Sequence, residues 1–199
     1  MEVDAVEIRV LGCLIEKQRT TPDQYPLSLN ALRLACNQTT NRDPVVDYDE
    51  RTIKAALERM SNRGWTRFAS GASSRALKYR HLLGEALSLS DAELALLAVL
   101  MLRGAQTPGE LKQRTERMHH FDSPADVVQT LDVLAGRELV RKVDRRPGQK
   151  EERYVQLLGG GQDEQPAPAP ETPVADSDFE ARLSRLEAVV EDLRARLEA

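Results

Sequence analysis

The chain carries one pattern of apolar residues twice, and an internal repeat constrains the fold more strongly than any single residue does. Ile8, Leu11 and Leu14 match Leu94, Leu97 and Leu100 at a constant offset of 86 positions. Later matches have offsets of 79, 74 and 75 positions, so the connecting segments of the two copies differ in length by a few residues. They include the pairs Ser28 and Thr107, Leu57 and Leu131, and Tyr79 and Tyr154. We expect one fold in both copies, with differences marking where their functions diverge.

Each copy has the signals of three helices. The first helix is predicted over about residues 4–17 and again over about residues 91–103, with its apolar residues spaced along one buried face. The second and third helices begin after side chains that suit an N-cap, because a hydroxyl or carboxylate oxygen accepts a backbone N–H there. These are Ser28 and Asp49 in the first copy, and Thr107 and Ser123 in the second.

A β-hairpin is predicted at the end of each copy. Two short β-like runs flank a polar, glycine-bearing turn, at residues 65–68 and 76–80 and again at residues 139–143 and 152–155. Three helices closed by a hairpin are the winged-helix variant of the helix-turn-helix. The predicted fold class is therefore mainly α with small β-hairpins (α+β), built from two tandem winged-helix domains.

The predicted domains are residues 1–84 and 85–158, followed by a flexible Gly/Pro/Ala linker over residues 159–177. Residues 178–199 have apolar positions with the 4-3 spacing of a coiled coil, which predicts a homodimer. The alternative is an amphipathic helix that folds back onto its own body. The a and d positions are Phe179, Leu183, Leu186, Val190, Leu193 and Leu197.

The net charge of −4 is unevenly distributed along the chain. Residues 1–83 carry 13 Lys and Arg against 10 Asp and Glu, residues 84–158 carry 11 against 12, and residues 159–199 carry 4 against 10. The acidity lies in the tail, so the overall charge does not exclude a nucleic-acid partner for the body. No apolar run reaches the roughly 18 residues of a membrane helix, and the N-terminus lacks a signal-peptide pattern, so we expect a cytoplasmic protein.

Several longer strings resemble a known family. They are VLGCLIEKQ at residues 10–18, YPLSLNAL at 25–32, NRDPV at 41–45 and LRGAQTPGEL at 102–111. On these strings the chain resembles the YceH family of uncharacterised bacterial proteins over about residues 5–158. The resemblance implies tandem winged-helix domains, and it brings no established activity and no functional residues.

The sequence shows no catalytic constellation, so we expect no enzyme, no cofactor and no metal site. The three histidines, His81, His119 and His120, have no Cys or carboxylate at ligand spacing and are expected to be ordinary helix-end residues. Cys13 and Cys36 are too few for a disulfide framework, and we expect two partly buried reduced thiols.

DNA binding is the predicted function of the first copy, because winged helices usually place the third helix in the major groove. Arg51 and Lys54 are three residues apart and share a face of that helix. The alternative is that these are solvated surface charges. Further candidate contacts to nucleic acid are Asn30, Arg33, Asn41, Arg42, Arg75 and Lys78.

The second copy differs, since its third helix, at about residues 124–135, has no Lys or Arg and carries Asp126 and Asp132. Its hairpin is basic, and the two interpretations are that it binds the DNA backbone or that it is a solvated turn, while its helix is free to contact another protein. A protein-interaction scaffold without direct DNA binding is therefore the alternative function. The basic hairpin residues are Arg141, Lys142, Arg145, Arg146 and Lys150.

Overall fold

The structure is a computed structural model that describes residues 3–69, 77–143 and 152–159. Its contacts divide the chain into a compact unit of residues 1–161, called the body below, and a second unit of residues 162–199. The predicted coiled coil lies outside the described residues, as do four predicted nucleic-acid contacts. These four are Arg75, Arg145, Arg146 and Lys150.

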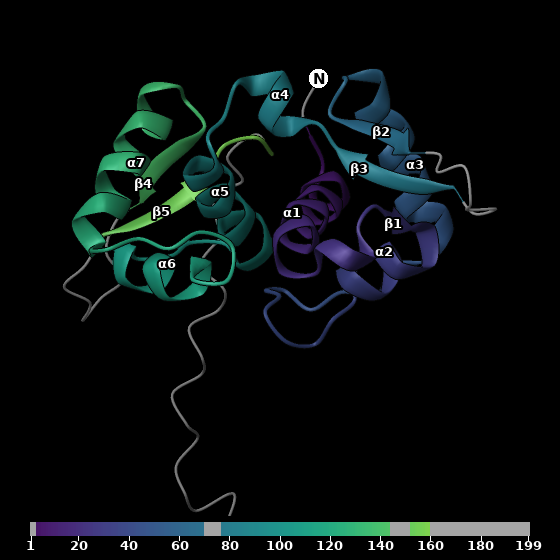
Figure 1. Cartoon of the computed structure of the whole chain (residues 1–199), viewed down its shortest axis with the longest axis horizontal. Helices are drawn as coiled ribbons and strands as arrows, with labels where there is room; N and C mark the ends of the chain where they lie inside the picture. Colours follow the sequence, from purple (N-terminus) through teal and green to yellow (C-terminus); the bar gives the residue numbers. More distant parts are fainter. Residues whose placement is uncertain (1–2, 70–76, 144–151, 160–199) are drawn as a thin grey trace, which may run out of the picture. The chain divides into compact units, whose positions relative to one another are not determined.

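The first half of the body begins with the long helix α1 (Ala5–Thr20) and a short 3₁₀ turn, η1 (Pro22–Gln24). Two further helices and a hairpin follow (Figure 1). The remaining elements of this half are β1 (Leu27–Ser28), α2 (Leu29–Cys36), α3 (Glu50–Asn62), β2 (Thr66–Ala69) and β3 (Lys78–His81).

The short helix α4 (Leu83–Leu87) leads into the second half, which has the same order of helices and hairpin. Its first helix has the bounds that the sequence predicts. The elements are α5 (Asp91–Arg103), α6 (Pro108–Thr115), α7 (Pro124–Gly136), β4 (Val140–Val143) and β5 (Arg153–Gln156).

The sheets of the two halves have equivalent topology. In the first half, β3 lies between β1 and β2, with antiparallel pairing on both sides. In the second half, β5 pairs with β4 and also forms an antiparallel bridge between Tyr154 and Gln106, the position equivalent to β1. The chain is thus mixed α+β, and its element order and strand pairing are compatible with the predicted winged-helix fold.

The predicted helix starts are confirmed by their capping hydrogen bonds. Ser28, Asp49 and Thr107 each accept a backbone N–H of the first helical turn. Ser123 and Asp126 complete a capping box, in which the Asp126 carboxylate accepts the backbone N–H of Ser123 at 2.9 Å. Aspartate therefore replaces the usual glutamate at this position without loss of the reciprocal bond.

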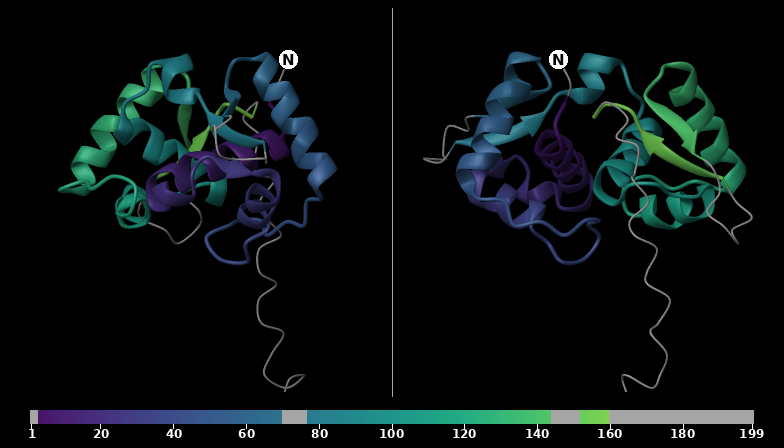
Figure 2. Two further views of the ribbon diagram at one scale, coloured as in Figure 1. Left: turned by 45° about the vertical axis from the view of Figure 1, so that its right-hand side comes forward. Right: turned by 180° about the vertical axis from the view of Figure 1, so that it is seen from behind.

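The equivalent helices α1 and α5 pack against each other, as both Figure 1 and the rear view in Figure 2 show. Every residue of α1 from Glu7 to Ile15 and of α5 from Glu93 to Leu102 is buried. The prediction of a single buried face therefore falls short, because each helix is covered by its own half on one side and by the other half on the opposite side. No described helix is long and apolar enough to cross a membrane.

Candidate nucleic-acid interface

Helix α3 separates an apolar face from a charged one. Ile53, Leu57 and Met60 are buried and hold the helix against the core of the first half. Arg51 and Lys54 are exposed, which fits both a nucleic-acid contact and the alternative of solvated surface charges. The Lys54 ammonium lies 3.9 Å from the Glu58 carboxylate one turn later, in an exposed ion pair that costs little to open.

Helix α2 carries two further predicted contacts, the polar residues Asn30 and Arg33. Asn30 is exposed, and its side-chain oxygen accepts a hydrogen bond from the half-buried Arg33 guanidinium at 3.1 Å. One turn of helix separates the two residues, so this contact is local and leaves the remaining guanidinium donors of Arg33 for another partner.

The β2–β3 hairpin has a basic outer face. Tyr79 and His81 point into the core, so their strand neighbours Lys78 and Arg80 point outward. Arg67 on β2 is exposed and lies directly opposite Arg80 in the strand register. The sequence interpretation found Lys78 and missed Arg67 and Arg80, which strict alternation along the hairpin would have identified.

Arg42 does not lie at a nucleic-acid surface. Its side chain is fully buried and forms an ion pair with Glu16 of α1. Its remaining donors bind the Ala35 and Asn41 carbonyls and the side-chain oxygen of Gln38, at 2.8–3.0 Å. The predicted phosphate contact at Arg42 does not fit this position, because every guanidinium donor is already used inside the protein.

Asn41 belongs to the same structural unit, the loop that joins α2 to α3 (residues 37–49). Arg103 at the end of α5 donates a hydrogen bond to the Asn41 side chain. The backbone N–H of Asp43 donates to the Leu102 carbonyl at 2.8 Å, and buried Arg9 of α1 donates to the Pro44 carbonyl. The loop therefore joins the first half to α5. The equivalent loop of the second half, between α6 and α7, is shorter, so this contact explains why the first copy has extra residues here.

The third helix of the second half, α7, presents no cation. Its only charged residues are Asp126, which belongs to the capping box, and the exposed Asp132. Val133 beside it is 56% exposed, a high value for a large apolar side chain. This surface is unsuited to a phosphate backbone and suits contact with a protein.

In the described part of the second hairpin, the two predicted basic contacts on β4, Arg141 and Lys142, do not share a face. The two residues are adjacent in β4, so strand alternation points their side chains to opposite faces of the sheet, and Lys142 is the more exposed of the two. The Lys142 ammonium lies 3.2 Å from Glu152 and 5.7 Å from the centre of the Tyr154 ring. The hydrogen bond to Glu152 raises the pKa of Lys142 above its ordinary value.

The family model described as "Protein of unknown function, DUF480" matches residues 3–149. The chain belongs to this family. The matched span runs from α1 through β4, so both halves of the body are part of what defines DUF480. The description assigns no activity.

Three buried side chains of this DUF480 protein differ from their predicted positions. His81 is a core residue of β3, where its Nε2 lies 2.6 Å from the Gln18 side-chain oxygen. Burial, followed by the positive charges of Arg80 and Arg19, lowers its pKa to about 4. Cys13 and Cys36 are both free and fully buried, where partial burial was expected.

Proposed function

We propose that this chain is a tandem winged-helix protein, related to the YceH proteins, that binds double-stranded DNA through its first half. The observation that carries the proposal is the exposed pair Arg51 and Lys54, on the side of α3 opposite its buried residues. The outer face of the β2–β3 hairpin adds Arg67, Lys78 and Arg80. The third helix and the hairpin of a winged helix are the two elements that usually contact DNA.

Each element has a distinct role in this proposal. Helix α3 enters the major groove, where the planar fork of Arg51 binds either a guanine edge or a phosphate. Lys54 leaves its exposed ion pair with Glu58 and binds phosphate as a point charge. The hairpin arginines contact the backbone and set the orientation of the helix, as phosphate contacts do in other complexes.

The test is a fluorescence-anisotropy titration of labelled duplex DNA at a series of salt concentrations. The wild-type chain is compared with Arg51→Ala/Lys54→Ala and with Lys112→Ala, which removes one charge from α6 in the other half. Each lost phosphate contact lowers the slope of log affinity against log salt by about 0.9. We expect the double variant to lose close to two contacts and Lys112→Ala to match the wild type. No binding at low salt, or equal slopes for all three proteins, contradicts the proposal.

A second candidate function is protein docking on the second half. A groove of about 470 Å³ lies between the starts of α6 and α7 and the second hairpin. Pro108, Pro124, Val128 and Tyr154 line it, and the Lys142–Glu152 ion pair is at its edge. A short apolar segment flanked by charge is the partner that such a groove favours.

One experiment on the full chain distinguishes DNA binding through α3 from protein docking in the groove of the second half. A pull-down is made with the wild type, with Val128→Asp in the groove, and with Arg51→Ala/Lys54→Ala on α3. A partner lost only with Val128→Asp, together with unchanged DNA affinity, supports docking on the second half. A partner retained by that variant rejects the groove.

We also propose that the chain forms a homodimer through residues 178–199, on the heptad pattern alone. Light scattering of the full chain and of a form ending at residue 177 tests this. We expect the shorter form to have half the mass of the full chain. A monomeric mass for both forms rejects the dimer and favours the alternative in which this segment folds back on the body.

A further inference from the structure

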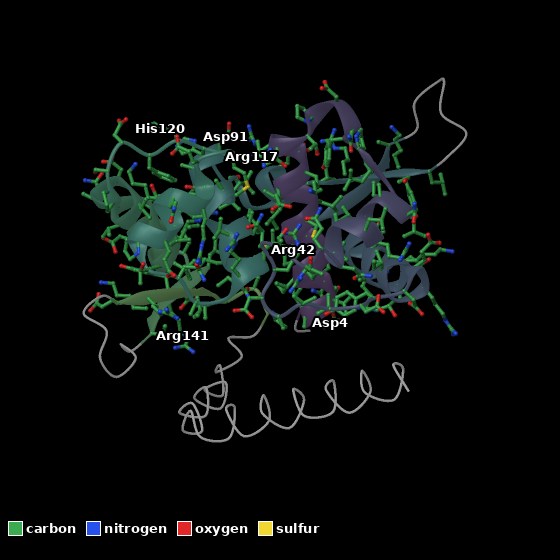
Figure 3. All side chains as sticks on the ribbon, turned by 90° about the horizontal axis from the view of Figure 1, so that it is seen from below. Asp4, Arg42, Asp91, Arg117, His120 and Arg141 are labelled. Atoms are coloured by element: carbon green, nitrogen blue, oxygen red, sulfur yellow. The ribbon has the colours of Figure 1, made fainter. Side chains whose placement is uncertain are left out.

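A cavity of about 400 Å³ lies between the two halves of the body, where α1 and the α2–α3 loop face α5 and α6. Three of its residues, Val99, Leu102 and Met118, form an apolar wall. In Figure 3, Arg42 and Arg117 appear along the border between α1 and the second half. The polar lining is Glu16, Thr20, Asn41, Arg103, Gln113, Arg114 and Arg117.

The cavity has an excess of positive charge. Glu16 is its one carboxylate, and both oxygens of Glu16 accept hydrogen bonds from the buried Arg42, at 3.1 and 2.6 Å. Arg42 therefore neutralises Glu16 from behind the cavity wall. Of the three lining arginines, Arg114 lies 3.4 Å from Glu110 on its own helix.

The other two arginines have no carboxylate of their own among the described residues. Arg103 donates to the neutral side chain of Asn41, and Arg117 is exposed. Burial, followed by the positive charges of Arg114 and Arg42, lowers the pKa of Arg103 below its ordinary value. Arg103 is therefore repelled by the neighbouring guanidinium groups of Arg114 and Arg42, and an anion placed beside it would offset that repulsion.

The donor set indicates the chemistry of the anion. Guanidinium forks match phosphate oxygens in geometry and charge. The volume lies within the range of roughly 300–1,000 Å³ that small-molecule sites occupy. The side chains of Asn41 and Gln113 supply neutral hydrogen-bonding groups, and the apolar wall suits a carbon skeleton.

We propose that this cavity binds a small phosphate-bearing organic anion, with Arg103, Arg114 and Arg117 on the phosphate group. The ligand would contact both halves at once, since Asn41 comes from the first half and the arginines from the second. Binding would therefore stabilise the junction between the halves, and the melting temperature would rise with ligand concentration.

The test is isothermal titration of the full chain with ribose 5-phosphate and with inorganic phosphate, in chloride buffers of matched ionic strength. We expect saturable binding at one site per chain. Arg103→Gln/Arg117→Gln should weaken binding by about tenfold or more, since each removes a charge-assisted hydrogen bond. Lys112→Gln on α6, outside the cavity lining, is the matched control and should leave the affinity unchanged. Arg117→Gln alone tests the site if loss of the Arg103–Asn41 bond unfolds the double variant.

The two ligands distinguish the sources of the phosphate group. Tighter binding of ribose 5-phosphate than of inorganic phosphate supports an organic ligand. Equal affinities for the two show a phosphate site but assign it to free phosphate, which overturns the organic part of the proposal. No saturable binding at millimolar concentrations, or unchanged affinity in a folded Arg117→Gln variant, overturns the proposal. If these variants weaken duplex DNA binding while neither small anion binds, the cavity belongs to a DNA surface and the proposal is also overturned.

Discussion

The buried guanidinium of Arg42 donates two hydrogen bonds to the carboxylate of Glu16, 26 positions earlier in the chain. This ion pair joins the loop between α2 and α3 to the central helix α1. The same loop reaches α5 through the Asp43 N–H and the Leu102 carbonyl. The α2–α3 loop looks like an exposed polar turn in the sequence, but its hydrogen bonds connect the two halves of the body.

Removal of the Arg42 side chain should destabilise the protein strongly. Arg42→Ala leaves Glu16 only 15% exposed and without its main partner, and breaking one side of a buried pair typically costs about 3–5 kcal/mol. Urea unfolding measures the change. Arg33→Ala, on the surface of α2, is the control and should change stability by only about 0.5 kcal/mol. If the Arg42→Ala protein is as stable as the wild type but binds DNA more weakly, the structural role is contradicted and Arg42 is a nucleic-acid contact.

The features that sequence predicts well here are local ones. Helix starts at Ser28, Thr107 and Ser123 follow from capping bonds that span three residues, and the hairpins follow from short alternating runs. The burial of Arg42 could not be predicted in this way, because its partner is distant in sequence and arginine is usually exposed.

The burial of α1 and α5 on all sides has a signal in the sequence, the length of a continuous apolar run, which helical spacing alone does not take into account. Residues 94–102 of α5 are nine consecutive apolar residues, which is more than a helix with one buried face needs. The run in α1 is shorter, at residues 10–15, and it does not extend to Glu7 and Arg9, which are buried and held by partners distant in sequence. The cavity between the halves depends on this packing, so Arg103 and Arg117 could not be grouped from sequence.

A larger side chain at Gly12 should disrupt the packing of α1 on α5. A Cβ atom at Gly12 would lie 3.0 Å from the side chain of Leu102 and 3.1 Å from Met101. We expect Gly12→Val to cost about 1–3 kcal/mol, as overpacking does in other cores. Gly136→Val is the control, since nothing lies within 4 Å of the added atom.

A double variant shows whether the Gly12 effect arises at this contact. Leu102→Ala removes the atoms nearest to Gly12, so Gly12→Val/Leu102→Ala should be more stable than the sum of the single changes implies. Additive changes in urea unfolding would place the cause within α1 itself.

The neutral His81 should make stability depend on pH. Its pKa is about 4 in the folded protein, against about 6.5 in an unfolded chain, so the unfolded state binds more protons between these values. The contribution is complete above pH 6.5 and is lost as the pH falls toward 4, by roughly 3 kcal/mol in total. Urea unfolding between pH 4 and 8 measures it. His81→Gln should flatten this part of the profile, and an unchanged profile in that variant would assign the pH dependence to other groups.

The turns that follow α3 and α7 contain the same left-handed backbone conformation with different residues. Gly64 has φ of +74°, and the equivalent Glu138, 74 positions later, has φ of +56°. Left-handed backbone costs a residue with a Cβ roughly 1–2 kcal/mol, and glycine avoids that cost while losing more entropy on folding. We therefore expect Glu138→Gly to stabilise the protein by a few tenths to about 1 kcal/mol. Gly64→Ala should destabilise it by about 1 kcal/mol, although no atom lies within 4 Å of the new Cβ. Thermal unfolding of the two variants measures both effects, and changes of the same sign would show that side-chain contacts, rather than backbone conformation, decide stability at these helix ends.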